Sequence, residues 1–300
     1  MRKLIIGTRG SKLALWQAHF TQDILADQGI ETELKIIKTR GDQIQHLSFD
    51  KIEGKGFFTK EIEDALLNKE VDFAVHSMKD MPTSSPEGLV LTAVSYREDP
   101  SDWLIILKSS LGDGLLKLKE NAIVGTSSAR RKAQPKHFRP DISLKDIRGN
   151  VPTRIEKLKT DGFDAIILAG AGISRLEIDL SEFEVVKFNP KEFIPAPAQG
   201  VLVYQTREDD LEVRRILKGI HHSDVSAKTN VERKVLQLLD GGCHLPLGVY
   251  CEMDQLGNYH VWAAFSGSEN APMKYVKYSS STSLGLAETV HKMLTDTNEH

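Results

Sequence analysis

The stretches "LIIGTRGSKLA" (residues 4–14) and "AIVGTSSARRKA" (residues 122–133) follow one pattern. Each begins with a short apolar run, turns through Gly-Thr, reaches a serine and continues into a segment with basic residues. An apolar run that stops at glycine before a serine and a polar segment is typical of a buried strand followed by a helix. The two stretches therefore predict one strand–helix unit near the start of each of two α/β halves, although Gly-Thr-Ser turns are common enough to recur by chance.

The segments around the first stretch alternate between strand and helix patterns. Apolar runs predict buried strands at 3–8, 31–39 and 71–78, and apolar residues at helical spacing predict helices within 11–29 and 58–70. Gly29 is a stop signal for the first helix, and Thr59 is expected to cap the second. This βαβαβ order predicts a parallel sheet with helices on its faces.

A similar order restarts after Pro100. Strands are expected at 102–108, 122–128, 142–149 and 163–172, and helices at 128–138 and 151–162. Pro135 is expected to end or kink the first of these helices, whereas Pro152 suits the first turn of the second. After a Pro/Gly-rich break at 193–202, the pattern predicts a strand at 201–206 and helices at 209–221 and 226–241. Alternating runs at 259–267 and 273–281, then a helical pattern at 284–297, predict a small α+β domain with antiparallel strands.

The composition excludes several classes of protein. Of the 300 residues, 40% are hydrophobic and 27% charged, and the net charge of −3 supplies no basic field for nucleic acid. No apolar run approaches the ~20 residues of a membrane span, and the N-terminus has no signal-peptide core. A cytoplasmic protein that binds neither membrane nor nucleic acid is therefore expected. The pairs His221-His222 and Cys243-His244 do not match zinc-ligand spacing, so no metal site is expected.

Polar residues follow the strand expected at 71–78, among them His76, Ser77, Lys79 and Asp80. Ligands of open α/β sheets gather at the carboxyl ends of strands, and a carboxylate there can stabilise a cation or move protons. The alternative is a capped turn with a surface ion pair.

Six arginines follow or flank expected strand ends and helix starts: Arg9, Arg130, Arg131, Arg148, Arg154 and Arg175. Guanidinium groups bind carboxylates through two parallel hydrogen bonds, so this clustering in a net-acidic chain favours a polyanionic ligand over scattered solvated charge. The loop at 41–58 carries Lys51 and Lys55 and is either a cover for a cleft or a plain surface loop.

Cys243 lies in "LLDGGCHLPLG" (residues 238–248), directly after two glycines. A free cysteine is often buried filler, but the glycines leave room for a covalently attached group, and a thiolate is a strong nucleophile. Both interpretations remain open on the residues alone.

Ordered motifs resemble the porphobilinogen deaminase family, also called hydroxymethylbilane synthases: "GTRGSKLALWQ", "GKGFFTKEIE", "DFAVHSMKDMPT", "GTSSARR", "RGNVPTR", "DAIILAGAGISRL", "PAPAQG" and "LDGGCHLPLG". The resemblance runs from Ile6 to about Tyr250. It implies a transferase that condenses four porphobilinogen molecules head to tail into hydroxymethylbilane, with release of ammonia, in tetrapyrrole (haem) biosynthesis. It also implies a dipyrromethane cofactor, held by a thioether to Cys243, on which the polypyrrole chain grows.

The fold implied by the resemblance consists of two α/β domains like type II periplasmic binding proteins and a smaller α+β C-terminal domain. The expected boundaries are 1–98 with 196–217 for the first domain, 99–195 for the second, and 218–300 for the third, which carries the cofactor cysteine. A monomer is expected.

Site residues follow position by position from the same resemblance. Asp80 matches the catalytic carboxylate, which would hold pyrrole N–H groups and stabilise the cation formed on deamination. Cofactor contacts are expected at Cys243, Lys79, Asp80, Thr126, Ser128, Arg130, Arg131 and Arg148. Substrate contacts are expected at Arg9, Ser11, Lys55, Arg148, Arg154 and Arg175.

The chain departs from the family pattern at two places. Ala198 stands where the family usually has glycine, which predicts a stiffer hinge, and His244 stands where glutamine is common. A non-catalytic, two-lobed binding module for carboxylated ligands is the main alternative function, because fold alone does not decide activity. Asp80 and the Cys243 turn favour the enzyme.

Overall fold

The computed structural model describes residues 2–39, 59–240, 245–267 and 271–296. The chain divides into two compact units, Met1–Glu98 with Gly200–Ala227, and Asp99–Gln199 with Lys228–His300. Each unit is thus built from two separate stretches of sequence. The division into three domains with boundaries at 196 and 218 stays a prediction.

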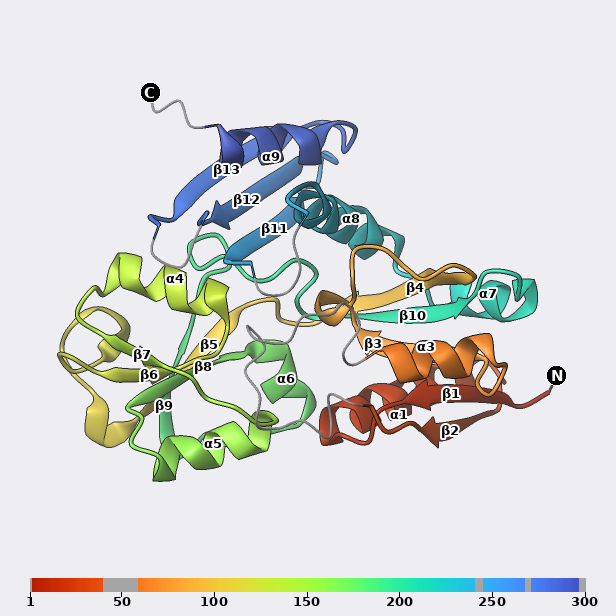
Figure 1. The fold of residues 1–300 in the computed structure, drawn as a ribbon, viewed down its shortest axis with the longest axis horizontal. Coiled ribbons are helices and arrows are strands. Elements are labelled where there is room, and N and C mark those ends of the chain that lie inside the picture. The colour runs from red at the N-terminus through yellow and green to blue at the C-terminus, as the bar shows by residue number, and fades with distance from the viewer. Residues whose placement is uncertain (1, 40–58, 241–244, 268–270, 297–300) are drawn as a thin grey trace. The chain divides into compact units, whose positions relative to one another are not determined.

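The first unit is a three-layer α/β structure (Figure 1). Its elements are β1 (Leu4–Thr8), α1 (Lys12–Ala26), β2 (Thr32–Ile36), α3 (Lys60–Leu67), β3 (Phe73–Ser77), the 3₁₀ helix η2 (Met78–Asp80), β4 (Leu89–Arg97), β10 (Val201–Arg207) and α7 (Leu211–Lys218). The strand order is β2-β1-β3-β10-β4. β1 pairs in parallel with β2 and β3, and β10 runs antiparallel between β3 and β4.

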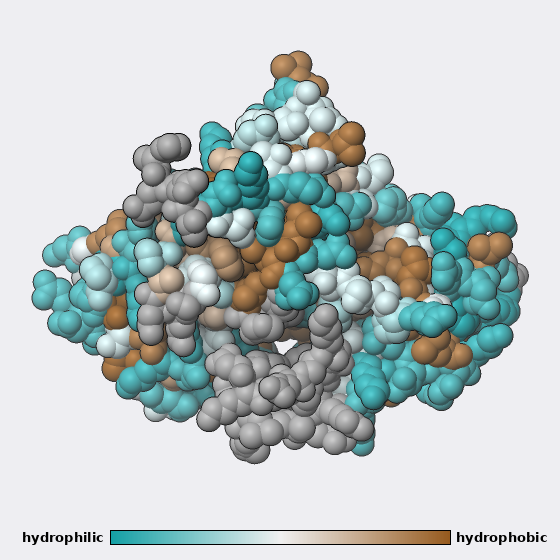
Figure 2. All heavy atoms as spheres, turned by 45° about the horizontal axis from the view of Figure 1, so that its top comes forward, coloured by the Kyte–Doolittle hydropathy of each residue, from teal (hydrophilic) through white to brown (hydrophobic). Residues whose placement is uncertain are grey.

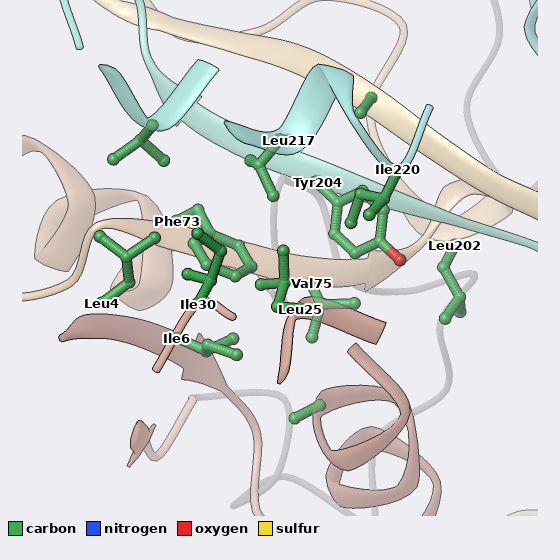
Figure 3. Close-up of a cluster of buried hydrophobic side chains, with 13 residues drawn as sticks. Leu4, Ile6, Leu25, Ile30, Phe73, Val75, Leu202, Tyr204, Leu217 and Ile220 are labelled. Atoms are coloured by element: carbon green, nitrogen blue, oxygen red, sulfur yellow. The ribbon is translucent and has the colours of Figure 1, made fainter. Parts of the chain in front are cut away.

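Alternation along the strands gives this sheet two apolar faces. One face packs Leu4, Ile6 and Phe73 against Leu25 of α1 and Leu217 of α7 (Figure 3). The other face contacts α3, whose apolar residues pack on Ala74 and Ile5. Burying both faces requires apolar residues at successive positions, as in the run at 3–8.

The second unit contains an equivalent sheet. Its elements are β5 (Asp102–Leu107), η3 (Lys108–Ser110), η4 (Leu115–Lys117), β6 (Ile123–Gly125), α4 (Ala129–Phe138), β7 (Ser143–Lys145), α5 (Val151–Thr160), β8 (Ala165–Ala169), α6 (Gly170–Arg175) and β9 (Phe183–Lys187). The strand order is β7-β6-β8-β5-β9, with β6 parallel to β7 and β8 and with β5 antiparallel to β8 and β9. Helices α5 and α6 cover one face, and Phe138 of α4 packs on the other.

The two sheets share one topology, which accounts for the repeated sequence pattern. β1 and β6 occupy the same place among the three parallel strands, and the helix after each begins at a serine N-cap, Ser11 or Ser128. In each sheet the antiparallel inner strand is the first strand after the chain crosses from the other unit, β5 on entry into the second unit and β10 on return to the first. The α/β class predicted for both halves is confirmed.

A third, antiparallel sheet belongs to the second unit. It consists of β11 (Leu247–Met253), β12 (Tyr259–Phe265) and β13 (Lys274–Ser280) in that order. Residues of α8 (Ser223–Leu238) and α9 (Leu286–Thr295) pack on one of its faces (Figure 1). The antiparallel strands predicted near the C-terminus are confirmed.

The structure corrects several local expectations. Helix α4 does not end at Pro135 but continues to Phe138. Proline costs the helix one hydrogen bond, and buried Gln134 holds this turn by exchanging two hydrogen bonds with the backbone of Ile194. Thr59 stands at the N-cap of α3, but its hydroxyl makes no capping hydrogen bond. The run at 163–172 is not one strand, because α6 begins at Gly170.

A buried carboxylate ties the 193–199 segment to the third sheet. Glu232 of α8 is fully buried, and its Oε2 accepts a hydrogen bond from the Ala198 N–H at 2.7 Å. Its Oε1 accepts one from the Cys251 N–H of β11 at 2.8 Å. Ala198 has φ +60°, a left-handed conformation that costs a residue with a Cβ about 1 kcal/mol. The bond from Glu232 holds it there.

Glu232→Gln is expected to lower the free energy of unfolding by about 2 kcal/mol, because the amide nitrogen cannot accept and leaves one of the two buried N–H groups without an acceptor. Urea unfolding measures this change, and amide hydrogen exchange at Ala198 and Cys251 should accelerate. Glu288→Gln, on the exposed side of α9, is the matched control and should change neither quantity. Equal stability of the two variants would contradict this role for Glu232.

Exposed apolar side chains are present but dispersed. Leu256 and Leu284 are 87% and 88% exposed. On the face drawn in Figure 2, hydrophobic residues are interspersed with hydrophilic ones. Among the described residues, none of the helices combines the length and the apolar character needed to cross a membrane.

Candidate functional site

The carboxyl end of β1 forms the first part of the site in the first unit. Thr8 is fully buried, and its hydroxyl donates to the Ala14 carbonyl at 3.1 Å, which fixes the turn into α1. The Ser11 hydroxyl accepts from the Ala14 N–H at 3.2 Å as the N-cap. Arg9 and Ser11 are half-buried on this turn. The structure therefore places both predicted substrate-binding residues at the sheet edge, with Ser11 also serving as a helix cap.

Asp80 is presented by a short, well-anchored turn at the end of β3. η2 begins at Met78 and is followed by Met81, each 3% exposed, while Asp80 between them is exposed and Lys79 half-buried. The Gln17 amide of α1 donates to the Ser77 hydroxyl at 2.8 Å and fixes the strand end. Because the methionines hold the turn from inside, the Asp80 carboxylate is displayed without being part of the core.

His76 lies in β3, just before the turn that carries Asp80, and is buried, with 7% exposure. Its neighbour Gln205 of β10 donates to the Glu63 carboxylate of α3 at 3.1 Å. Burial, opposed by the Gln205 side chain and assisted by the charge of Arg9, lowers the pKa of His76 from 6.5 to about 4. The imidazole is therefore neutral at pH 7, and no positive charge from it competes with Arg9 at this edge.

Stability is expected to fall in acid because of His76. The unfolded chain binds the proton near pH 6.5 and the folded chain only near pH 4, so the stabilisation is complete above pH 6.5 and is lost as the pH falls to about 4. The full loss is roughly 3 kcal/mol. Thermal unfolding between pH 7 and pH 4.5 measures it, and His76→Gln should flatten the pH dependence. His19→Gln, at an exposed histidine, should keep the wild-type slope; equal slopes for both variants would contradict the assignment.

The carboxyl end of β6 begins the site of the second unit. Thr126 is 2% exposed, and its N–H donates to the Lys145 carbonyl at 2.9 Å. Its hydroxyl accepts from the Ser128 N–H at 3.3 Å, and the Ser128 hydroxyl caps α4 by accepting from the Arg131 N–H. Thr126 and Ser128, both predicted cofactor contacts, thus fix the turn at which α4 begins, and Arg130 and Arg131 lie in the first turn of that helix.

Arg130 and Arg131 lie in the interior, at 4% and 7% exposure. Both bind Asp102, the fully buried first residue of β5, which sequence reasoning missed. Burial alone would raise the pKa of the Asp102 carboxyl, but the two guanidinium groups outweigh it and hold that pKa far below its usual range. Burial and the charge of Arg131 lower the pKa of Arg130, and Asp102 opposes this. An aspartate at the start of an apolar strand was the available sequence signal.

The three remaining predicted arginines follow β7 and β8. Arg148 and Arg154 are half-buried, and the Arg154 Nε donates to the Gly149 carbonyl at 2.7 Å. Arg175 ends α6 and is 5% exposed. Position 170, at which α6 begins, requires glycine, because a Cβ there would lie 2.4 Å from the indole nitrogen of Trp103.

The predicted residues therefore fall into two sets, one in each unit. Arg9, Ser11, Lys79 and Asp80 share the carboxyl edge of the first sheet, and Thr126, Ser128, Arg130, Arg131, Arg148, Arg154 and Arg175 follow strands of the second. Cys243, Lys55 and His244 lie outside the described residues. Among those described, Cys251 is a buried cysteine, and no group of three or more His, Cys, Asp or Glu side chains is arranged to hold a metal.

Comparison with known structures gave periplasmic and extracellular binding proteins at low similarity. One is the probable amino-acid-binding protein YtmK of Bacillus subtilis, with TM-score 0.46 and 11% identity over 80% of this chain and 97% of that chain. Another is a periplasmic protein of Salmonella typhimurium with high arginine specificity, with TM-score 0.43 and 12% identity over 75% of this chain and 94% of that chain.

Comparison of sequences gave much closer relatives. The family model described as porphobilinogen deaminase, dipyromethane cofactor binding domain, matches residues 4–215. The porphobilinogen deaminase of Sulfurimonas denitrificans is 47% identical over 83% of this chain and 79% of that protein, and that of Nitratiruptor sp. is 49% identical over 82% and 78%. The enzyme of Oceanobacillus iheyensis is 47% identical over 85% and 82%. On these matches, the chain belongs to the porphobilinogen deaminase family.

Proposed function

We propose that this chain condenses four porphobilinogen molecules head to tail into hydroxymethylbilane and releases one ammonia for each. Family membership makes the protein a transferase of tetrapyrrole synthesis with a dipyrromethane cofactor. The structural observation that carries the proposal is the exposed Asp80 carboxylate on a turn whose two methionines are buried. A carboxylate fixed at a sheet edge can act on a ligand without rearrangement of the core.

Asp80 is proposed to act on the pyrrole ring of the substrate. In each condensation, the carbon–nitrogen bond to the amino group breaks and a carbon–carbon bond forms to the α-carbon of the acceptor ring. That carbon loses its proton, which balances the proton that the amino group gains to leave as ammonia. Positive charge develops on the substrate as the amine leaves, and a fixed carboxylate stabilises that charge. The Asp80 oxygens would also accept hydrogen bonds from the pyrrole N–H, which orients the ring.

The arginines are proposed to bind the acidic side chains of the substrate and of the growing chain. Each porphobilinogen unit brings two carboxylates, and the guanidinium fork matches a carboxylate in shape and charge. The proposed substrate contacts are Arg9, Ser11, Lys55, Arg148, Arg154 and Arg175.

The residues present fit a dipyrromethane cofactor. Such a group is acidic, and the buried cluster of Arg130, Arg131 and Asp102 contains two positive charges and one negative charge. When bound, the cofactor supplies the ring to which the first substrate unit is added. We propose that Cys243 holds it through a thioether and that Lys79, Asp80, Thr126, Ser128, Arg130, Arg131 and Arg148 contact it.

Intact-mass measurement tests this proposal. The purified chain is expected to be heavier than its sequence by one dipyrromethane group, located by peptide mapping on the Cys243 peptide. Cys243→Ala should lose the added mass and the release of ammonia from porphobilinogen. Cys251→Ala, at the other cysteine, is the matched control and should retain both. An unmodified wild-type chain that does not consume porphobilinogen would instead indicate a binding module.

The proposal includes a monomer that acts in the cytoplasm without a metal. Its support is membership of the porphobilinogen deaminase family. Light scattering of the purified chain during gel filtration should give the mass of one chain. Activity should survive dialysis against a chelator.

A further inference from the structure

Both oxygens of Asp102 are occupied by donors from distant parts of the second unit. Oδ2 accepts from the Arg130 Nη1 at 2.6 Å. Oδ1 accepts from the Arg131 Nη2 at 2.7 Å and Nε at 3.1 Å, and from the Gln199 Nε2 at 2.8 Å. The carboxylate thus fixes the orientation of both guanidinium planes, and Gln199 fixes the carboxylate.

Main-chain carbonyls hold the same two side chains from their other sides. The Arg130 Nη1 also donates to the Ile194 carbonyl at 3.0 Å, and the Arg131 Nη1 donates to the Ile167 carbonyl at 3.3 Å. In the described part of the chain, all side-chain hydrogen bonds of Arg130 use Nη1. The Nε and Nη2 edge of Arg130, which is one of the forks that binds a carboxylate, therefore donates to no protein group in those residues.

The cluster also has an excess of positive charge. Within the described residues, Asp102 is the one carboxylate that forms an ion pair with Arg130 or Arg131. A buried charge without a partner is costly, so a second carboxylate at this place would be stabilising. The ligand class that the cluster favours is therefore an organic anion with a planar carboxylate.

We propose that Asp102 is a positioning residue, which orients Arg130 and Arg131 so that the free edge of Arg130 meets a ligand carboxylate. This inference rests on the proposed function, in which the two arginines bind the cofactor. Asp102 itself touches neither cofactor nor substrate in this proposal. It acts through the two arginines, and Gln199 supports it from the point where the chain leaves the unit.

A positioning role and a simple counter-charge role predict opposite changes in binding. Removing the negative charge of Asp102 raises the local positive potential, which by Coulomb attraction alone strengthens the binding of an anion. If Asp102 orients the forks, its removal frees both guanidinium groups to rotate and weakens the bidentate bond. The sign of the change in affinity therefore separates the two roles.

The test compares Asp102→Asn with the wild-type holoenzyme. The fraction of purified chain that carries the cofactor mass is measured by intact-mass spectrometry, and KM and kcat are measured for porphobilinogen per loaded chain. We expect a loaded fraction lower by about fivefold or more, and a KM raised about tenfold with a smaller change in kcat. A loaded fraction and a KM that are unchanged, or a lower KM, would overturn the proposal.

Asp141→Asn is the matched control for this variant. Asp141 also forms a two-bond ion pair with an arginine next to α4, with Arg139 Nε and Nη2 each 2.7 Å from its oxygens, but it is at the protein surface. The control should load fully and keep the wild-type KM. If Asp141→Asn lowers the cofactor-loaded fraction as much as Asp102→Asn does, the loss of any ion pair at this helix has the same effect. That result would overturn the proposal.

A second variant keeps the test decisive if Asp102→Asn does not fold. Gln199→Met preserves size and the charge of the cluster but removes the hydrogen bond to Oδ1, together with the bond that Gln199 donates to the Pro100 carbonyl and the one it accepts from Arg131 Nη2. We expect a folded chain with KM raised about threefold, and an unchanged KM would overturn the proposal.

Arg130→Lys distinguishes failure of this inference from failure of the proposed function. Lysine keeps the charge but lacks the fork. If Arg130→Lys loads poorly while Asp102→Asn loads fully, the arginine binds the cofactor and the positioning role is wrong. If Arg130→Lys also loads fully, the proposed cofactor contact at Arg130 is itself wrong.

Discussion

Asp80→Asn is expected to lower kcat at least about a hundredfold, with a much smaller change in KM. The asparagine side chain keeps the size of the aspartate but carries no charge, so it cannot offset the positive charge that develops as ammonia leaves. The fold should be unaffected, since Asp80 is exposed and Met78 and Met81 anchor its turn. Ammonia release and product formation measure the effect at saturating porphobilinogen.

The control for this variant is Asp27→Asn, at the exposed C-cap of α1 in the same unit. It should keep the wild-type kcat. Intact mass adds a second readout, because the Asp80 variant should carry the cofactor yet fail to add substrate units. A kcat within twofold of wild type would remove Asp80 from its proposed role.

Gly248→Ala is expected to destabilise the second unit by about 3 kcal/mol. Gly248 lies in β11, and a Cβ there would be 2.5 Å from the carbonyl oxygen of Ile194. The obstacle is backbone, which cannot rotate away as a side chain can. β11 would have to move, which would strain the hydrogen bond from the Val249 N–H to the Pro195 carbonyl at 3.0 Å.

The effect of Gly248→Ala should extend to Arg130. The same Ile194 carbonyl accepts hydrogen bonds from Arg130 and Gln134, so displacing it disturbs the position of the guanidinium group. Urea unfolding measures the stability, and the loaded fraction measures the effect on the cofactor. Gly267→Ala is the control, because its Cβ would meet no atom of the described residues within 4 Å and its φ is ordinary. Equal stability of the two variants would contradict the close approach.

Local patterns were sufficient to predict the parallel strands of the two α/β sheets and most helices. Short apolar runs that end in glycine or a polar turn identified β1, β3 and β6, because strands buried on both faces must be apolar throughout. β4 was not predicted. Its pairing with β10 contains register shifts, and these interrupt the two-residue periodicity by which a strand is recognised.

The interior of the site depends on contacts that no local pattern reveals. Arg130 was expected at a cleft edge from its place after a strand, but it is held inside by Asp102, 28 residues earlier in the chain. Gln199 reaches Asp102 across 97 residues, and Glu63 reaches Gln205 across 142. Such partners are brought together by the topology, so the sequence predicted the arginine but not the residues that orient it.

The place of β10 in the first sheet determines the order in which the nascent chain can complete its parts. Strand β10 lies between β3 and β4, yet it is made only after residue 200, whereas the strands of the second unit's parallel-rich sheet are complete by Lys187. During synthesis on the ribosome, all strands of the second unit's sheet are therefore made before the first unit's sheet is complete. Until β10 is made, β4 has no strand to pair with in the first sheet. A ribosome stalled far enough beyond Lys187 for β9 to have left the exit tunnel should present a protease-resistant second sheet and an incomplete N-terminal one.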